Sequence, residues 1–223
     1  MKNFTLVLSI LLSAQIHFGQ VVTDQKEAER IYKESVQESK VSKQYFAEIE
    51  ECRNLLRREK YVQAEIGCRL AISTAEKFPK SRYMEKHSAY KALGVALLWQ
   101  RKAQEAISYF DKSLEVGKPN LDDSTAETGE IYFLLGQSNH FLGKLKLAEG
   151  FYTKAESVYR SAFKIMKDID SDEFLLKPYG KSIVNILKAH LILLESGGMK
   201  DEAAQIEKRL TETALEFAKY LDK

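Results

Sequence analysis

The chain has 223 residues, which is enough for one domain of ordinary size with a substantial core. Charged residues occupy 30% of the positions and proline occurs only three times, a composition that favours an all-α soluble protein. The formal net charge is only +2, which argues against nucleic acid or an acidic membrane surface as a partner, because either would call for a clustered basic excess.

The N-terminal residues have the order of a secretory signal peptide. Lys2 gives a basic start, and an apolar run from Phe4 to Ile16 follows it. The run is too short to span a membrane, which needs about 20 apolar residues. We predict a signal peptide at residues 1–19, cleaved after Gly19 or, as the alternative, after Ala14. The other interpretation is an N-terminal helix packed in the fold. Export would place the chain in the periplasm or outside the cell, with no stable membrane insertion once the signal is removed.

The next segment predicts long helices. From Asp24 to about Arg57 there is no Gly or Pro, which favours one long helix, or two with a joint near Ser39 to Ser42. A further helix is expected from about Tyr61 to Lys77, where a proline ends it. We assign residues 20–44 to an N-terminal helix that leads into a helical repeat domain at residues 45–223.

The clearest repeat pattern covers residues 90–119. Apolar residues follow one helical stripe in each half, so two amphipathic helices are expected to meet around residues 100–102. Gly94 and Ala106 are small where the helices approach closely, and Phe110 is large enough to fill the space between them. This spacing resembles the tetratricopeptide repeat family.

Four segments of the chain align on this pattern without gaps. In each segment an alanine stands five residues in, at Ala64, Ala106, Ala155 and Ala203. These alanines are 42, 49 and 48 residues apart, against 34 in the common repeat, and the longer units resemble those of the kinesin-light-chain type. The resemblance implies an all-α fold, a short right-handed α-solenoid of about four helix-turn-helix repeats.

The third unit has two possible registers. Gly143 with Gly150 and Ala155 is preferred, because Gly150 would suit the turn between the two helices. The alternative register uses Gly136, Ala148 and Tyr152 at the standard spacing.

Helix boundaries are also indicated by short motifs. Ser124 and Glu127 have the spacing of a capping box, which predicts a helix start at that point. A later helix is expected to begin in the acidic break from Asp168 to Asp172, or only near Pro178. The pair Gly197-Gly198 predicts the last turn.

Cys52 and Cys68 are the only cysteines. In the repeat alignment Cys52 occupies the small position of a first helix and Cys68 the large position of a second helix. These positions face each other, so a disulfide that staples the first hairpin is geometrically reasonable. The alternative is two buried core residues that stay reduced.

Motifs of catalysis and metal binding are absent from the sequence. The histidines at positions 87, 140 and 190 fall at different places in their repeats, so they are not expected to gather on a metal. Ser161 and Lys164 match a Ser-x-x-Lys pair, which we interpret as helix surface. We therefore predict no enzyme activity, no cofactor and no metal.

The repeat resemblance implies a concave groove lined by the first helix of each pair. The alignment places seven polar or aromatic residues there: Arg53, Lys91, Trp99, Gln137, His140, Asn185 and Lys188. Such a groove could hold an extended or helical peptide, with Trp99 as an apolar anchor. The alternative for Trp99 is packing against the neighbouring repeat.

The sequence therefore predicts an exported scaffold that binds a protein or peptide partner. The alternative is a ligand-sensing regulatory domain of a periplasmic signalling system. An enzyme with an unrecognised site ranks below both.

Overall fold

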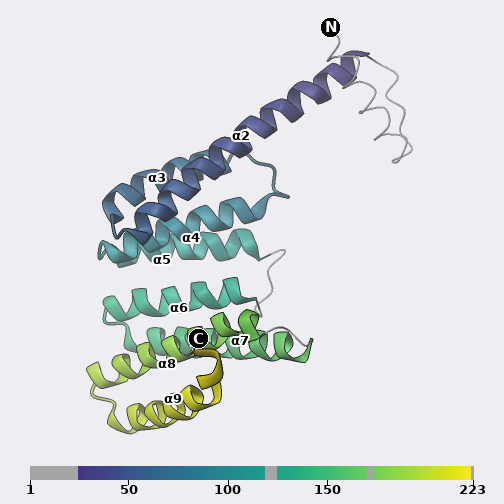
Figure 1. Cartoon of the computed structure of the whole chain (residues 1–223). Coiled ribbons are helices and arrows are strands. Elements are labelled where there is room, and N and C mark those ends of the chain that lie inside the picture. The colour runs from purple at the N-terminus through teal and green to yellow at the C-terminus, as the bar shows by residue number, and fades with distance from the viewer. Residues whose placement is uncertain (1–24, 119–124, 170–172, 222–223) are drawn as a thin grey trace. The chain divides into compact units, whose positions relative to one another are not determined.

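The computed structural model of the chain describes residues 25–118, 125–169 and 173–221 (Figure 1). Every helix or strand in these ranges is an α-helix, which confirms the predicted all-α class. The helices are α2 (Gln25–Arg57), α3 (Tyr61–Ala75), α4 (Tyr83–Trp99), α5 (Ala103–Gly117), α6 (Ala126–Phe141), α7 (Leu145–Asp168), α8 (Glu173–Ser196) and α9 (Lys200–Leu221). The predicted signal peptide at residues 1–19 lies outside the described residues.

The chain divides into two units, residues 1–47 and residues 48–223. The segment predicted as one helix or two is one helix, α2, which crosses this boundary. In the first unit, Arg30 forms ion pairs with Glu27 and Glu34 on the exposed surface of α2. Exposed pairs of this kind contribute little to stability, because water screens them.

The described residues of the second unit form four helix hairpins. The end of α2 pairs with α3, followed by the pairs α4 with α5, α6 with α7, and α8 with α9 (Figure 1). Each hairpin packs on the next through α3 on α4, α5 on α6, and α7 on α8. Successive first helices also meet, α4 with α6 and α6 with α8. The predicted stack of about four helix-turn-helix repeats is therefore confirmed.

The four hairpins share one kind of turn. Three residues connect the helices, and the middle residue has a positive φ of 59° to 72° in each case: Glu59, Arg101, Gly143 and Gly198. The amide of the following residue bonds to a carbonyl five positions earlier, as Lys60 N does to Leu55 O at 2.9 Å. This is the hydrogen bond of a Schellman-type helix end. Because the turns match, counting from the middle residue gives equivalent positions in all four hairpins.

This count shows that the preferred register of the third repeat is wrong. Gly143 lies in the turn, whereas Gly150 lies inside α7 with open space around the point where a Cβ would be. Ala148 therefore takes the position of the earlier alanines, so Ala64, Ala106 and Ala148 are 42 residues apart and Ala203 follows 55 residues after Ala148. A Cβ on Gly136 would come within 2.6 Å of the Tyr152 ring, so the close approach of the two helices requires glycine there.

The structure also gives the starts of α6 and α8, the two helix starts that the sequence motifs predicted. Thr125 caps α6, because its hydroxyl accepts a hydrogen bond from the amide of Thr128 at 3.3 Å. The cap is thus one residue later than the motif predicted, and Ser124 lies outside the described residues. The first helix of the last hairpin, α8, begins at Glu173, directly after the acidic segment, and not near Pro178, which lies inside the helix.

Candidate partner-binding surfaces

The first hairpin is stapled by a disulfide. Cys52 of α2 and Cys68 of α3 are fully buried, and their Cα atoms are 5.1 Å apart. The bond occupies the place that a glycine and an aromatic ring fill in the next two hairpins, the pairs Gly94–Phe110 and Gly136–Tyr152. A disulfide bond thus takes the place of the aromatic ring that packs against glycine in those two hairpins, and it links α3 covalently to α2.

The residues predicted for a groove lie on the first helix of each hairpin, α2, α4, α6 and α8, and the surface they form is called the first-helix face. Arg53 of α2 donates a hydrogen bond to Ser88 Oγ of α4 at 2.6 Å. Lys91 of α4 forms an ion pair with Glu130 of α6. Both cations therefore have partners within the chain, and a ligand would compete with these contacts. Glu130 was missed by the sequence alignment because the third repeat was placed seven residues too late.

The remaining groove candidates lie on α6 and α8. His140 Nε2 of α6 lies 3.3 Å from Ser196 Oγ of α8, and burial lowers the pKa of this histidine. Gln137 is half-buried on α6, while Asn185 and Lys188 are exposed on α8. The structure therefore brings neighbouring first helices together through polar side chains.

Trp99 lies at the end of α4 and packs on the preceding hairpin. Its ring stacks on Tyr61 of α3, with ring centroids 6.2 Å apart, and 45% of the residue remains exposed. Trp99 therefore has the contact expected from packing against a neighbouring repeat, and it also retains surface that a partner could cover.

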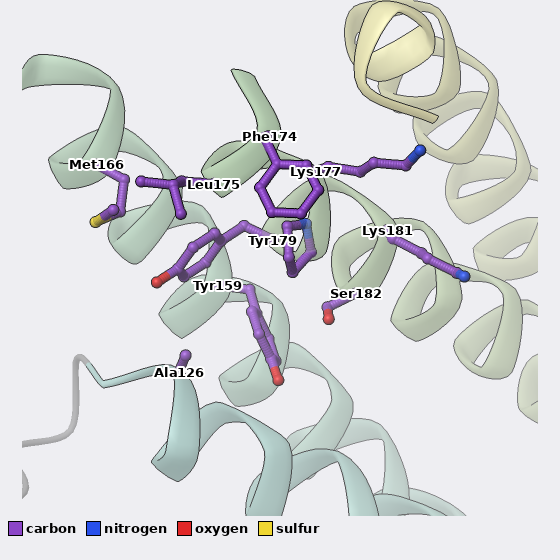
Figure 2. A pocket seen from close by; sticks show the side chains of 10 residues that line it. Ala126, Tyr159, Met166, Phe174, Leu175, Lys177, Tyr179, Lys181 and Ser182 are labelled. Carbon is purple, nitrogen blue, oxygen red and sulfur yellow. The ribbon is translucent and has the colours of Figure 1, made fainter. Parts of the chain in front are cut away.

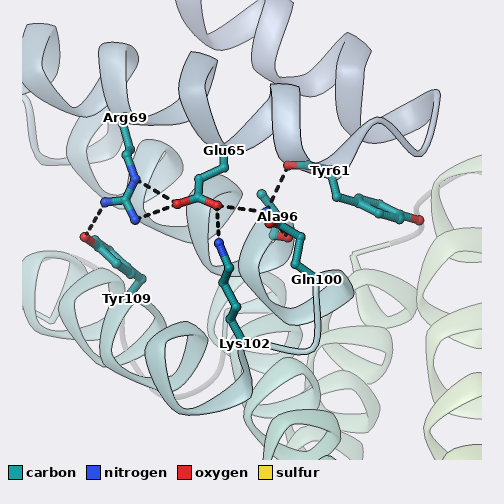
Figure 3. Close-up of polar contacts among 7 residues, drawn as sticks. All are labelled: Tyr61, Glu65, Arg69, Ala96, Gln100, Lys102 and Tyr109. Carbon is teal, nitrogen blue, oxygen red and sulfur yellow. Dashed lines mark hydrogen bonds and ion pairs between the residues drawn. The ribbon is translucent and has the colours of Figure 1, made fainter.

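A polar network around Glu65 fixes α3 on the second hairpin (Figure 3). The carboxylate accepts hydrogen bonds from Lys102 Nζ at 2.8 Å, Gln100 Nε2 at 2.9 Å and Arg69 Nη2 at 2.8 Å. These donors, chiefly Lys102, lower the pKa of Glu65 to about 2. Arg69 also donates to the Tyr109 hydroxyl of α5 at 3.1 Å. The inner side of α3 is thus tied down, which leaves its outer side to face solvent.

The outer side of α3 carries an exposed apolar stripe, formed by Val62, Ile66 and Leu70. These residues are four positions apart, so they lie on one face of the helix, and they are 63%, 62% and 54% exposed. The equivalent positions of the other hairpins are mostly polar: Gln104, Ser108 and Lys112 in α5, Lys146, Gly150 and Lys154 in α7, and Asp201, Gln205 and Arg209 in α9. The α3 stripe is thus a local departure from the repeat.

The α3 stripe was not predicted from the sequence. The signal was present, because the four second helices can be compared position by position once their turns are aligned. Apolar residues at solvent-facing positions of one repeat, where the other repeats have polar residues, indicate an interaction surface.

The residues that the structure describes hold neither a cluster of metal-binding side chains nor a helix that could span a membrane. These residues contain no group of three or more His, Cys, Asp or Glu side chains placed to hold a metal ion. Nor does any helix within the described ranges have both the length and the apolar character needed to cross a membrane.

The second and third hairpins match the model of a known protein family. Residues 85–161 match the tetratricopeptide repeat family model. The match covers α5 and α6 completely and most of α4 and α7, the helices that carry the pairs Gly94–Phe110 and Gly136–Tyr152. No match is found among curated proteins.

Several solved structures are similar to the chain. The tetratricopeptide repeat domain of Arabidopsis FLU shares 24% identity over 52% of this chain and 93% of that chain, with a TM-score of 0.47. Kinesin-light-chain repeats from Podosopora anserina share 10% identity over 76% of this chain and 94% of that chain, also at 0.47. BtubC from P. vanneervenii shares 13% identity over 82% and 94%, at 0.42.

Proposed function

We propose that this protein binds another protein or a peptide and catalyses no reaction of its own. The observation that carries the proposal is the α3 stripe, because its exposed apolar side chains are held on a helix that is fixed by a disulfide and by the Glu65 network. A rigid apolar face loses little conformational freedom on binding, which favours affinity. Tetratricopeptide repeats in the adjacent hairpins fit a role in protein interaction.

The partner that fits this surface presents an apolar face of its own. Covering a Val, Ile or Leu side chain contributes about 1.5–3 kcal/mol each when burial is complete. The first-helix face, with Lys91, Lys188 and Trp99, is the second candidate contact. To bind acidic groups of a ligand there, Lys91 would have to give up its ion pair with Glu130, and Lys188 its contact with solvent.

Affinity capture from the cell envelope with the full chain and two triple variants tests both surfaces. The first variant, Val62→Gln, Ile66→Ser and Leu70→Lys, copies the side chains that α5 carries at the equivalent positions. The second variant, Lys91→Ala, Lys188→Ala and Trp99→Ala, replaces three of the seven first-helix candidates. Circular dichroism and thermal unfolding establish that each variant is folded.

We expect a partner that binds the native chain directly, once purified, and that binds the α3 variant at least tenfold more weakly. Equal weakening by the first-helix variant alone would move the contact to the groove. A partner that binds all three chains equally, or no direct binding by the native chain, would refute a role for either surface.

We also propose that the protein acts in the periplasm or outside the cell. The basic and apolar start of the sequence supports export, and a structural disulfide suits an oxidising compartment. A reporter enzyme that is active only outside the cytoplasm, fused after residue 19, tests this. Activity that persists when Lys2 and the run from Phe4 are scrambled would contradict the proposal.

A further inference from the structure

An apolar cavity of about 550 Å³ lies between α7 and α8, next to the start of α6 (Figure 2). Its walls are mainly aromatic and aliphatic: Tyr159, Met166, Phe174, Leu175, Pro178 and Tyr179. The volume lies within the range of small-molecule sites, about 300–1,000 Å³, and such sites are lined mainly by apolar groups. Its lining residues include none of the seven predicted groove residues and none from α3.

The cavity is built by a segment that the repeat does not require. Counted from the turn, Tyr159 is the equivalent of Gly117, the last residue of α5. α7 nevertheless continues to Asp168, more than two turns further, and α8 begins at Glu173. The added turns place Met166 in the wall of the cavity.

These added turns pack on the core of the last hairpin, which holds the wall that carries Met166. Phe163 of α7 packs in a cluster with Leu176 of α8 and Phe217 of α9, and the rings of Phe163 and Phe217 are 4.7 Å apart in an edge-to-face arrangement. The cavity is therefore preformed by packed helices.

Large apolar side chains remain exposed at its edge. Phe174 is 78% exposed and Leu175 is 49% exposed, on the first turn of α8. Exposed apolar groups beside an apolar cavity indicate a site that gains by being covered.

Positive charge lies at one edge of the cavity. Lys177 and Lys181 lie one turn apart on α8, and their side chains extend the same way, away from Met166 (Figure 2). Among the described residues that line the cavity, none is an Asp or Glu. On the α6 side, Glu127 and Glu130 act on the hydroxyl of Tyr159, whose pKa is raised to about 12, chiefly by burial. An anionic group is thus favoured at the lysine edge and disfavoured near α6.

We propose that this cavity binds a small amphiphile with one anionic head group and one acyl chain, of the fatty-acid class. The head group lies against the ammonium groups of Lys177 and Lys181. The chain lies over the walls formed by Met166, Tyr159 and Tyr179, and it covers Phe174 and Leu175. Two lysines supply charge without a fixed geometry, which suits a carboxylate at the mouth of an apolar site.

Calorimetric titration of the full chain with decanoate, below its micelle concentration, tests the proposal. Decyltrimethylammonium is the probe with the same chain length and the opposite charge. The variant Lys177→Glu with Lys181→Glu reverses the charge of the cavity edge. The variant Lys164→Glu with Lys167→Glu makes the same charge change on the exposed surface of α7 and is the matched control.

We expect saturable binding of one decanoate per chain, weakened at least tenfold by the cavity-edge variant and less than twofold by the control. The cationic probe should bind the native chain at least tenfold more weakly than decanoate does. No saturable binding of decanoate, or equal binding by both variants, would overturn the proposal. So would a protein partner whose binding needs Lys177 and Lys181 while decanoate neither binds nor competes, because the cavity would then be a protein contact.

Discussion

Gly136 and Gly150 allow the register of the third hairpin to be tested with two single methyl groups. Gly136 faces the buried ring of Tyr152, and a Cβ there would come within 2.6 Å of ring carbons. Gly150 lies in α7, exposed, with nothing within 4 Å of a Cβ. The same substitution to alanine should therefore have opposite effects at the two positions.

The magnitudes follow from packing and helix propensity. Alanine in place of an exposed helical glycine contributes about 1 kcal/mol, so Gly150→Ala should stabilise the chain by about that amount. At Gly136 the propensity gain is the same, but overpacking costs about 1–3 kcal/mol, and the centrally placed ring of Tyr152 has little room to move. The overpacking cost is therefore expected in the upper half of that range, about 2–3 kcal/mol, which leaves a net loss of about 1–2 kcal/mol for Gly136→Ala.

Thermal unfolding followed by circular dichroism measures both variants. One kcal/mol corresponds to about 2–4 °C in Tm for a chain of this size, so Gly150→Ala should raise Tm by about 2–4 °C and Gly136→Ala should lower it by a similar amount or more. If Gly150 instead occupied the turn between two helices, its alanine variant would be strained and Tm would fall. A fall in Tm for Gly150→Ala would thus refute the register.

Three further predictions concern the turns, the polar network and the disulfide. Glu59 has a positive φ of 59°, which glycine adopts without strain, so Glu59→Gly should stabilise the chain by about 0.5–1 kcal/mol in urea unfolding. Gly143→Ala at the equivalent position should destabilise it. A loss of stability for Glu59→Gly would argue against the shared turn. The pKa of Glu65 is lowered to about 2, so the stabilising effect of its carboxylate is complete above the ordinary pKa near 4.5 and disappears as pH falls towards 2. After allowance for solvent screening, this effect amounts to about 1–2 kcal/mol. The difference in unfolding free energy between the native chain and Glu65→Gln should therefore close between pH 5 and pH 2. A gap that stays constant over this range would assign the loss to packing. Replacing Cys52 and Cys68 together by serine opens a loop with a sequence separation of 16 and should cost about 3 kcal/mol, measured by urea unfolding, with reduction of the native chain as a parallel measurement; an unchanged unfolding midpoint would contradict a stabilising staple.

Much of the fold was accessible from the sequence. Helical periodicity and the scarcity of Gly and Pro predicted the helices, and the spacing of Gly94, Ala106 and Phe110 predicted how the second hairpin packs. These signals are local, because a helix hairpin is formed by residues close together in the chain. The facing positions of Cys52 and Cys68 followed from the same spacing.

The register of the third repeat could not be decided locally. The pairs Leu135-Gly136 and Leu142-Gly143 are seven residues apart, close to two helical turns, so both present glycine on nearly the same face. Only the packing of Tyr152 against Gly136, together with the positive φ of Gly143, distinguishes them.

Sequence alone determined the helical class of this protein, its hairpin organisation and the absence of recognisable catalytic motifs, since these depend on residue type and short spacing. Tertiary structure decided which side chains meet and which remain exposed. It paired Lys91 with Glu130, left the α3 stripe exposed, and formed a cavity where α7 and α8 extend past the repeat. The physical reason is that pairing and exposure depend on which helix lies beside which, and that arrangement is set by side-chain packing between hairpins distant in the chain.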